Sequence, residues 1–114
     1  MNIHYQHQFK EVLQNGTKKH TIRMKEYKKG TALAHIIFPY RPYRECVLSN
    51  VCQSTQKIQV DGINKKVIID NKIISDDAII NLAKNDGFSH IEEFWKFFRK
   101  GEEGYIIHWT DLRY

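Results

Sequence analysis

The sequence contains few cysteines and prolines, two of each among 114 residues, and no long apolar run. No stretch approaches the roughly 20 consecutive apolar residues that a membrane-spanning helix needs. The first ten residues are polar and lack the apolar segment of a signal peptide. We therefore expect a cytoplasmic protein without membrane contact, in which the two cysteines are reduced thiols.

The common motifs of catalysis and cofactor binding are also missing. The chain has no Gly-rich phosphate loop, no Cys-x-x-Cys pair, no His-Glu-x-x-His and no Gly-x-Ser-x-Gly. Its six histidines are scattered, and none forms a set with the spacing of metal ligands. Cys46 and Cys52 would lie about 20 Å apart on one continuous strand, too far for a disulfide, and we expect both to be half-buried apolar residues. The sequence predicts neither a metal site nor a cofactor.

The composition is that of one small globular domain. Apolar residues make up 41% and aromatic residues 12% of the chain, which argues against disorder. A chain of this length suits a single domain, which we place over residues 1–114. One core and one cleft fit this size, but a separate substrate domain does not. The sequence does not indicate an oligomeric state.

The positive charge is concentrated in one segment. The formal net charge is +5, and residues 10–29 alone carry seven basic side chains against two acidic ones. A local excess of this kind suits an anionic partner, with RNA or a nucleotide first in line. The alternative is a solvated Lys-rich surface without a ligand.

The order of predicted elements favours an α+β fold that is mostly β. Apolar spacing predicts helices over about 7–15, from 75 onward and from 89 onward, and the last has an apolar stripe that we assign to the core. Ser75 is the expected cap of the second helix, and residues 89–92 have the spacing of a capping box. Strands are expected over 19–24, 32–38, 45–60 with a bulge near 53–55, 67–69, 72–74 and 105–110; residues 70–71 form a hairpin turn, 39–44 a loop, and Gly101 and Gly104 bracket a turn. Because helices and strands do not alternate strictly, a small mixed or antiparallel barrel with about three helices at its openings fits best.

One run of residues combines several reactive side chains. Gly16 to Arg23 leaves the first helix and enters a strand, on which Lys19, Thr21 and Arg23 share one face and His20 and Ile22 the other. With Ile22 in the core, Thr21 and Arg23 would face a cleft or solvent. A lysine can activate a threonine hydroxyl, and an arginine can hold a phosphate, a carboxylate or a base edge. The alternative is an exposed basic strand without chemistry.

This run resembles the motif near the start of ASCH domains. Its Lys-x-x-Thr-Ile-Arg core, the downstream Asp86-Gly87-Phe88, a helix with Glu93-Phe94 and the terminal strand at 105–110 resemble that family in order and spacing, from about residue 9 to residue 110. The resemblance implies a PUA-like (pseudouridine-synthase-and-archaeosine-transglycosylase-like) β-barrel with helices around a cleft. It also implies binding of RNA or of a modified nucleoside.

The chain is also similar to a bacterial branch of small ASCH proteins that are acetylcytidine amidohydrolases. By motif, Lys18 and Thr21 match the first two catalytic residues of that branch, and Asp86 stands where the branch has Glu, a side chain one methylene longer. The resemblance implies that Thr21 attacks an amide carbonyl, Lys18 assists it, and Asp86 activates water or protonates the leaving amine. Arg23 would orient the substrate or stabilise the oxyanion.

Further residues are candidates for RNA contact. Tyr40, Arg41, Tyr43 and Arg44 interleave aromatic and cationic side chains, as in loops that stack on bases and bind phosphates, although an ordinary surface loop has the same composition. Trp109 shares a face of the last strand with Tyr105 and is a candidate to stack on a base, with the barrel core as its alternative. We interpret His108 as a structural histidine.

Three functions remain open at this level. The first is RNA or nucleotide binding without turnover, involving Lys19, Arg23 and the loop residues just named. The second is an enzyme, either a small amidohydrolase acting on an acetylated cytidine-type nucleoside or an RNA-cleaving enzyme. The third is a regulatory domain whose basic face meets an acidic protein. Asp86 in place of Glu favours the binding module over the enzyme.

Overall fold

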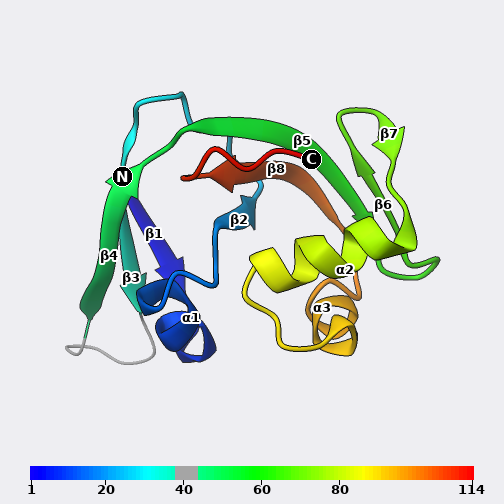
Figure 1. Ribbon diagram of the computed structural model, residues 1–114, viewed down its shortest axis with the longest axis horizontal. Helices are drawn as coiled ribbons and strands as arrows, with labels where there is room; N and C mark the ends of the chain where they lie inside the picture. Colours follow the sequence, from blue (N-terminus) through cyan, green and yellow to red (C-terminus); the bar gives the residue numbers. More distant parts are fainter. Residues whose placement is uncertain (38–43) are drawn as a thin grey trace.

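The computed structural model describes residues 1–37 and 44–114 of the chain, and strand residues outnumber helical ones (Figure 1). The α+β class with a predominance of β structure is confirmed. The elements follow the order β1 (Asn2–Tyr5), η1 (His7–Phe9), α1 (Lys10–Gln14), β2 (His20–Arg23), β3 (Ala32–Ile37), β4 (Glu45–Val51), β5 (Ser54–Asp61), β6 (Lys66–Ile69), β7 (Lys72–Ile73), α2 (Asp76–Asn85), α3 (Ile91–Phe97) and β8 (Glu102–His108).

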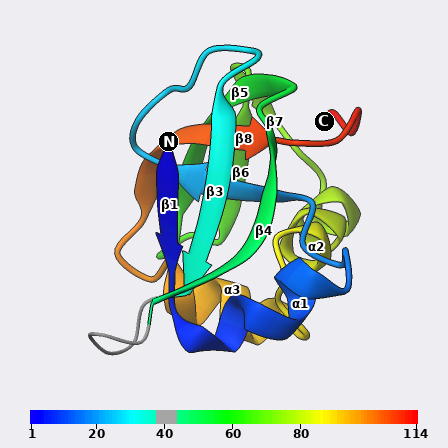
Figure 2. The same cartoon turned by 90° about the vertical axis from the view of Figure 1, so that its left-hand side faces the viewer.

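The strands form two sheets. The smaller sheet has the order β1-β3-β4, with β1 parallel to β3 and β4 antiparallel to it. The larger sheet has the order β2-β8-β5-β6-β7 and is antiparallel throughout. Figure 2 shows β1, β3 and β4 crossing in front of β2 and β8 at a steep angle, and the helices gathered at one end of both sheets. Among the described strands the two sheets do not close into a barrel.

The segment 45–60 was expected to be one bulged strand, but it is two strands in different sheets. The chain leaves β4 at Val51 and enters β5 at Ser54, and in Figure 1 the two follow one another along a single arch over the molecule. Cys52 lies at this passage and is buried, whereas Cys46 on β4 is exposed. The prediction that both cysteines are half-buried on one strand is therefore wrong, because the strand ends between them.

The helix starts were predicted with mixed success. The Ser75 hydroxyl accepts a hydrogen bond from the Ala78 amide at 3.2 Å, which confirms it as the cap of α2. The capping box at 89–92 is wrong: α3 is capped at His90, whose side chain makes no capping hydrogen bond. The hairpin between β6 and β7 is confirmed. Asp70 and Asn71 form its turn with φ angles of 50° and 68°, the left-handed conformation that this tight turn requires.

Strands β1 and β8 differ from the sequence prediction. Strand β1 was not predicted, because its four residues are mostly polar and gain their order from parallel pairing with β3. Strand β8 begins at Glu102, so Gly104 lies inside a strand and not beside a turn. A Cβ atom at Gly104 would meet the Arg23 carbonyl oxygen at 2.3 Å. Glycine there allows β2 to lie against β8.

The core lies between the sheets and the helices. The apolar stripe of α3 is confirmed as core, with Phe94 and Phe98 buried and with Ile91 and Trp95 packed against them. Phe9 and Phe88 bring the first helical segment and the turn after α2 into the same aromatic cluster, their ring centroids 5.6 Å apart. Within the described part of the chain, no helix is both long and apolar enough to cross a membrane.

Candidate functional site

Strand β2 carries the candidate residues between the two sheets. Thr21 is only 2% exposed, so the prediction that it faces a cleft or solvent is wrong. The reason is that β1 covers this face of β2: the Arg23 guanidinium donates to the His4 carbonyl oxygen at 2.8 Å and lies over the Tyr5 ring. His20 and Ile22, on the opposite face, are buried as well. Of the four β2 residues, Arg23 alone is partly exposed.

Lys18 and Asp86 meet directly, although 68 residues separate them in the sequence. The Lys18 ammonium donates to the Asp86 backbone oxygen at 2.6 Å and to its Oδ1 at 3.1 Å. Both side chains are almost fully buried. The Lys18 amide donates to Val12 of α1, and Asp86 caps α2, so two helices fix the pair. A Cβ atom at Gly87 would lie 2.9 Å from the Val12 side chain, which explains a glycine directly after the aspartate.

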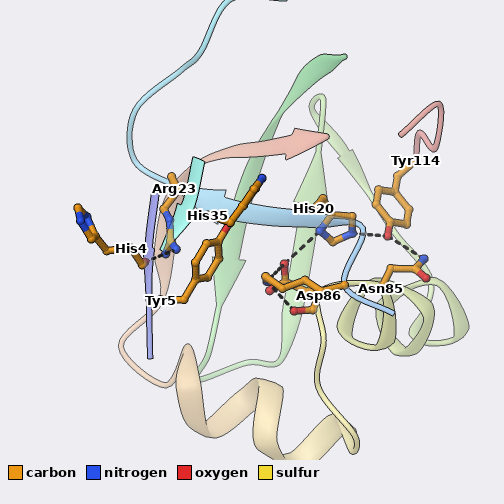
Figure 3. Close-up of polar contacts among 9 residues, drawn as sticks. His4, Tyr5, His20, Arg23, His35, Asn85, Asp86 and Tyr114 are labelled. Atoms are coloured by element: carbon orange, nitrogen blue, oxygen red, sulfur yellow. Dashed lines mark hydrogen bonds and ion pairs between the residues drawn. The ribbon is translucent and has the colours of Figure 1, made fainter. Parts of the chain in front are cut away.

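A hydrogen-bonded chain extends from Asp86 to the C-terminal segment (Figure 3). His20 donates from Nδ1 to Asp86 Oδ1 at 3.1 Å and accepts at Nε2 from the Tyr114 hydroxyl at 2.6 Å. The Asn85 amide in turn donates to the Tyr114 hydroxyl at 3.1 Å. These partners fix a neutral His20 with its proton on Nδ1. We call Lys18, His20, Asn85, Asp86 and Tyr114 the Asp86 cluster.

Burial and charge act against each other in this cluster. Burial lowers the pKa of the Lys18 ammonium, and the Asp86 carboxylate offsets part of this effect. Burial alone would raise the pKa of Asp86, but the Lys18 charge and the bond from His20 hold it below its usual value. Burial also lowers the pKa of His20, which remains neutral. The result is a buried Lys–Asp ion pair, in which the lysine loses its proton more readily than in water.

A second chain of hydrogen bonds lies beyond the opposite end of β2. The Tyr5 hydroxyl is 2.7 Å from His35 Nδ1, and His35 Nε2 is 2.7 Å from Asn50 Oδ1. Figure 3 shows Tyr5 and His35 together near Arg23, away from His20 and Asp86. We call Tyr5, His35 and Asn50 the Tyr5 cluster. The Lys18 ammonium lies 5.6 Å from the centroid of the Tyr5 ring and so connects the two clusters.

The surface beside the Tyr5 cluster is cationic. The Arg23 guanidinium lies over the Tyr5 ring, 4.9 Å from its centroid, and Arg44 contacts the His4 ring at 3.0 Å. Lys19 is exposed at the other end of β2, where its backbone amide bonds to Asn85. Tyr40, Arg41 and Tyr43 lie outside the described residues. The structure thus brings Arg23 and Arg44 to one region and leaves Lys19 at some distance along the strand.

The remaining predicted candidates lie in the interior. Trp109 is 9% exposed and packs against His35 with ring centroids 4.4 Å apart, so its role in stacking on a base stays a prediction. His108 is fully buried and contacts Gln56 Oε1 at 2.9 Å through Nε2, while its Nδ1 has no partner among the described atoms. The hydrogen bond to Gln56 is typical of a structural histidine, but only one of the two His108 nitrogens has a partner among the described atoms.

Two hollows of the described surface lie away from these clusters. One, of about 750 Å³, borders α3 at Phe88, Lys96 and Phe97. The other, of about 660 Å³, lies on the outer face of the larger sheet beside Met24 and Ile63. Within residues 1–37 and 44–114, no three His, Cys, Asp or Glu side chains gather as a metal site would require.

Sequence reasoning named Lys18 and Asp86 but missed most of the other residues in the two clusters. Tyr5 lies on the strand that was not predicted, His35 lies in an apolar run, and Tyr114 follows the last strand. No local pattern marks any of them, because their partners come from distant segments. The one available signal was composition: His35 is a polar residue inside a run predicted to be buried, and a buried imidazole needs partners.

Comparisons with known proteins found no relative of this chain. No family model matches the chain, and neither the curated proteins nor the solved structures contain a match.

Proposed function

We propose that this chain is an ASCH-like domain that binds RNA or a nucleotide at the Arg23 end of β2. In this proposal the two sheets, joined through β4 and β5, are an opened form of the PUA-like barrel. The observation that carries the proposal is the meeting of Lys18 and Asp86 beside Tyr5, whose ring also lies under the Arg23 guanidinium. The residues named by the ASCH resemblance thus lie around one tyrosine.

The charges favour a ligand with phosphate. Lys18 is buried and paired with Asp86, whereas Arg23 and Arg44 lie close to the surface on either side of His4. A guanidinium can hold two phosphate oxygens at once and keep its stacking on an aromatic ring. Phosphate would therefore bind at Arg23 and Arg44, and the adjoining base or sugar would lie towards Tyr5.

Titration with a fluorescent single-stranded RNA tests this proposal. Anisotropy should report binding that weakens steeply between about 50 and 200 mM salt, because phosphate contacts release counterions. Arg23→Gln should weaken binding and flatten the salt dependence. A matched control is Arg99→Gln, since Arg99 is exposed after α3. Equal losses in both variants, or no binding by the wild-type chain, would remove the proposal.

The Lys18–Asp86 pair favours a second candidate, hydrolysis of an acetylated cytidine-type nucleoside. A lysine with a lowered pKa is suited to proton transfer, and the Thr21 hydroxyl lies beside the same tyrosine as the lysine. The shorter aspartate reaches Lys18 through both its side chain and its backbone oxygen. A longer acid is therefore not needed for contact with the lysine.

Incubation with acetylcytidine distinguishes this candidate from a pure binder. Release of cytidine and acetate by the wild-type chain, and its loss in Thr21→Val, would support hydrolysis. Thr21→Ser keeps a hydroxyl and should retain turnover, which separates chemistry from packing. A wild-type chain that releases no more cytidine than a Lys18→Ala control is not this enzyme.

A further inference from the structure

The face of the larger sheet that is turned away from the core carries two adjoining hollows. One, of about 660 Å³, lies beside Met24 and Ile63, and the other, of about 310 Å³, shares Met24, Ile68 and Glu103 with it. Along β5 and β6, buried residues alternate with more exposed ones, which places the core on one side of the sheet and the hollows on the other. We call this surface the Met24 face and define it by Met24, Lys57, Ile63, Ile68, Ile73 and Glu103.

The most exposed large apolar side chains of the described residues gather on the Met24 face. Met24, Ile63 and Ile73 are 77%, 86% and 70% exposed. Ile73 lies opposite Ile68 in the β6–β7 hairpin, and Ile68 lines both hollows. Figure 1 shows β6 and β7 at the end of the larger sheet that lies away from β1, β3 and β4, so the smaller sheet does not cover them. Apolar side chains gathered in this way indicate a surface that another protein covers.

The turn between β5 and β6 holds Ile63 in its exposed position. The Asp61 carboxylate accepts hydrogen bonds from the Ile63 and Asn64 amides, each at 3.1 Å, and from the Asn64 side chain at 2.9 Å. A Cβ atom at Gly62 would meet the backbone oxygen of Phe98, so this turn packs directly against the end of α3. The apolar side chain is therefore presented by a fixed turn, and little conformational freedom is lost when a partner covers it.

Charges of both signs surround the Met24 face. The cations around the two hollows are Lys57, Lys66 and Lys100, and the carboxylates are Asp61, Glu102 and Glu103. Neither Lys57 nor Glu103 forms an ion pair with another described residue. A polyanion such as RNA would be attracted by Lys57 but repelled by Glu103. The mixture of charges fits a partner that likewise carries both signs.

A second copy of the chain is such a partner. In a two-fold dimer the same surface of both copies meets, so each surface must supply both sides of every contact. Strand pairing places Glu103 opposite Gln59 and Gln59 opposite Ile68, while Met24 follows β2 on the other side of β8. A two-fold axis that runs along the strands between β5 and β8 reverses this row in the second copy. Met24 of one copy would then meet Ile68 of the other, and Glu103 would meet Gln59 and, two residues along β5, Lys57.

We propose that the Met24 face is the interface of a two-fold dimer of this chain. The interface covers the exposed apolar side chains and brings Glu103 of each copy to Lys57 of the other. The Arg23 guanidinium lies outside it, because it is directed towards the His4 carbonyl oxygen and the Tyr5 ring. The inference therefore goes beyond the proposed function and does not depend on the binding of RNA or a nucleotide.

Sedimentation velocity over about 1 µM to 1 mM protein tests the inference, because it resolves dissociation constants between these values. The wild-type chain should pass from monomer to dimer within this range. Ile63→Glu places a charge at the most exposed apolar position and should weaken the dimer by about tenfold or more. Ile80→Glu is the matched control, since Ile80 is a half-exposed isoleucine on α2 that borders a different hollow, and the substitution changes the net charge equally. It should dimerise as the wild type does.

Charge reversal tests the contacts across the interface. Glu103→Lys makes the Met24 face predominantly cationic, and Lys57→Glu/Lys66→Glu makes it predominantly acidic. Like charges would then meet in each homodimer, so each variant alone should be monomeric at concentrations where the wild type is a dimer. An equimolar mixture of the two variants should form a heterodimer, because opposite charges meet again. Circular dichroism confirms that both variants are folded.

The outcomes decide the inference separately from the proposed function. A dimer that is weakened by Ile63→Glu but not by Ile80→Glu, together with a heterodimer in the mixture, supports the inference whether or not the chain binds RNA. A wild-type chain that stays monomeric at about 1 mM overturns it, and the face would then belong to a different protein partner. Equal weakening by Ile63→Glu and Ile80→Glu places the interface elsewhere and also overturns it, as does a mixture that contains no heterodimer.

Discussion

The two clusters at the ends of β2 are built from similar groups but differ in charge and in their surroundings. The Asp86 cluster is ionic, lies between two helices and the C-terminal segment, and saturates its histidine on both nitrogens. The Tyr5 cluster is neutral and lies beside the partly exposed Arg23. The first cluster holds a charged pair in the interior, whereas the second places neutral groups next to a cation that reaches the surface. We therefore expect the first to support the fold and the region beside the second to contact a ligand.

The largest expected effect is loss of the aspartate. Asp86→Ala leaves the Lys18 ammonium buried without its counter-charge and removes the acceptor of His20. Breaking one side of a buried pair costs about 3–5 kcal/mol of unfolding free energy. Urea denaturation measures this loss of unfolding free energy. The double variant Lys18→Met/Asp86→Asn removes both charges and should lose less; an equal or larger loss would show that the ion pair is not what the site requires.

Acid should destabilise the whole fold through its buried histidines. Burial lowers the pKa of His20 and of His35, and it lowers the pKa of His108 to about 3. Each is protonated in the unfolded chain near pH 6.5 but resists protonation when folded. Their stability contribution is therefore complete above pH 6.5 and declines as the pH falls towards 3. The midpoint of urea unfolding should fall steadily over this range.

A variant sharpens the assignment of the acid effect. His108→Gln keeps an amide able to bond Gln56 and removes the imidazole whose pKa burial lowers to about 3. Its urea midpoint should depend less on pH between 6.5 and 4 than that of the wild type. An unchanged slope would mean that His108 does not contribute to the acid effect.

The two tyrosines provide a matched pair of smaller changes. Tyr5→Phe leaves His35 Nδ1 without its donor, and Tyr114→Phe does the same to His20 Nε2. A buried polar group left unpaired costs about 1–3 kcal/mol. The loss should be larger for Tyr5, which is 5% exposed, because water can replace the hydroxyl of the half-buried Tyr114. Thermal unfolding compares them, and the reverse order would contradict the view that the C-terminal segment is the more accessible.

The smallest effect on stability is expected at Lys19. Its side chain is exposed, and surface substitutions of this kind usually change stability by less than about 0.5 kcal/mol. Lys19→Ala should nevertheless weaken RNA binding slightly, because it removes one positive charge near the proposed site. Parallel anisotropy and urea measurements separate the two effects. A large loss of stability would show that Lys19 has a structural role that its exposure does not indicate.

Local patterns in the sequence were enough to predict much of the fold. The apolar stripe of α3, the Ser75 cap and the Asp70-Asn71 turn each depend on residues close in sequence, and all three are confirmed. Strand β1 could not be predicted, since its order comes from pairing with a strand about 30 residues away. The division of segment 45–60 between two sheets is likewise a long-range effect.

The site was less accessible to prediction. Lys18, Thr21 and Asp86 were named through a family resemblance. The burial of Thr21 did not follow from the alternation along β2, because β1 covers one face of that strand. Tyr5 and His35 were missed, as nothing in the sequence around either residue indicates a partner. The contacts that give these residues their chemistry arise only when the sheets cross.

We expect ligands to meet the chain at the Arg23 end of β2, beside the Tyr5 cluster. A titration of ¹⁵N-labelled protein with a short single-stranded RNA, followed by ¹H–¹⁵N correlation spectra, tests it most directly. The largest shifts should occur at Tyr5, Thr21, Arg23 and Arg44. Shifts confined to the hollow at α3, or to the outer sheet face around Met24 and Ile63, would contradict it.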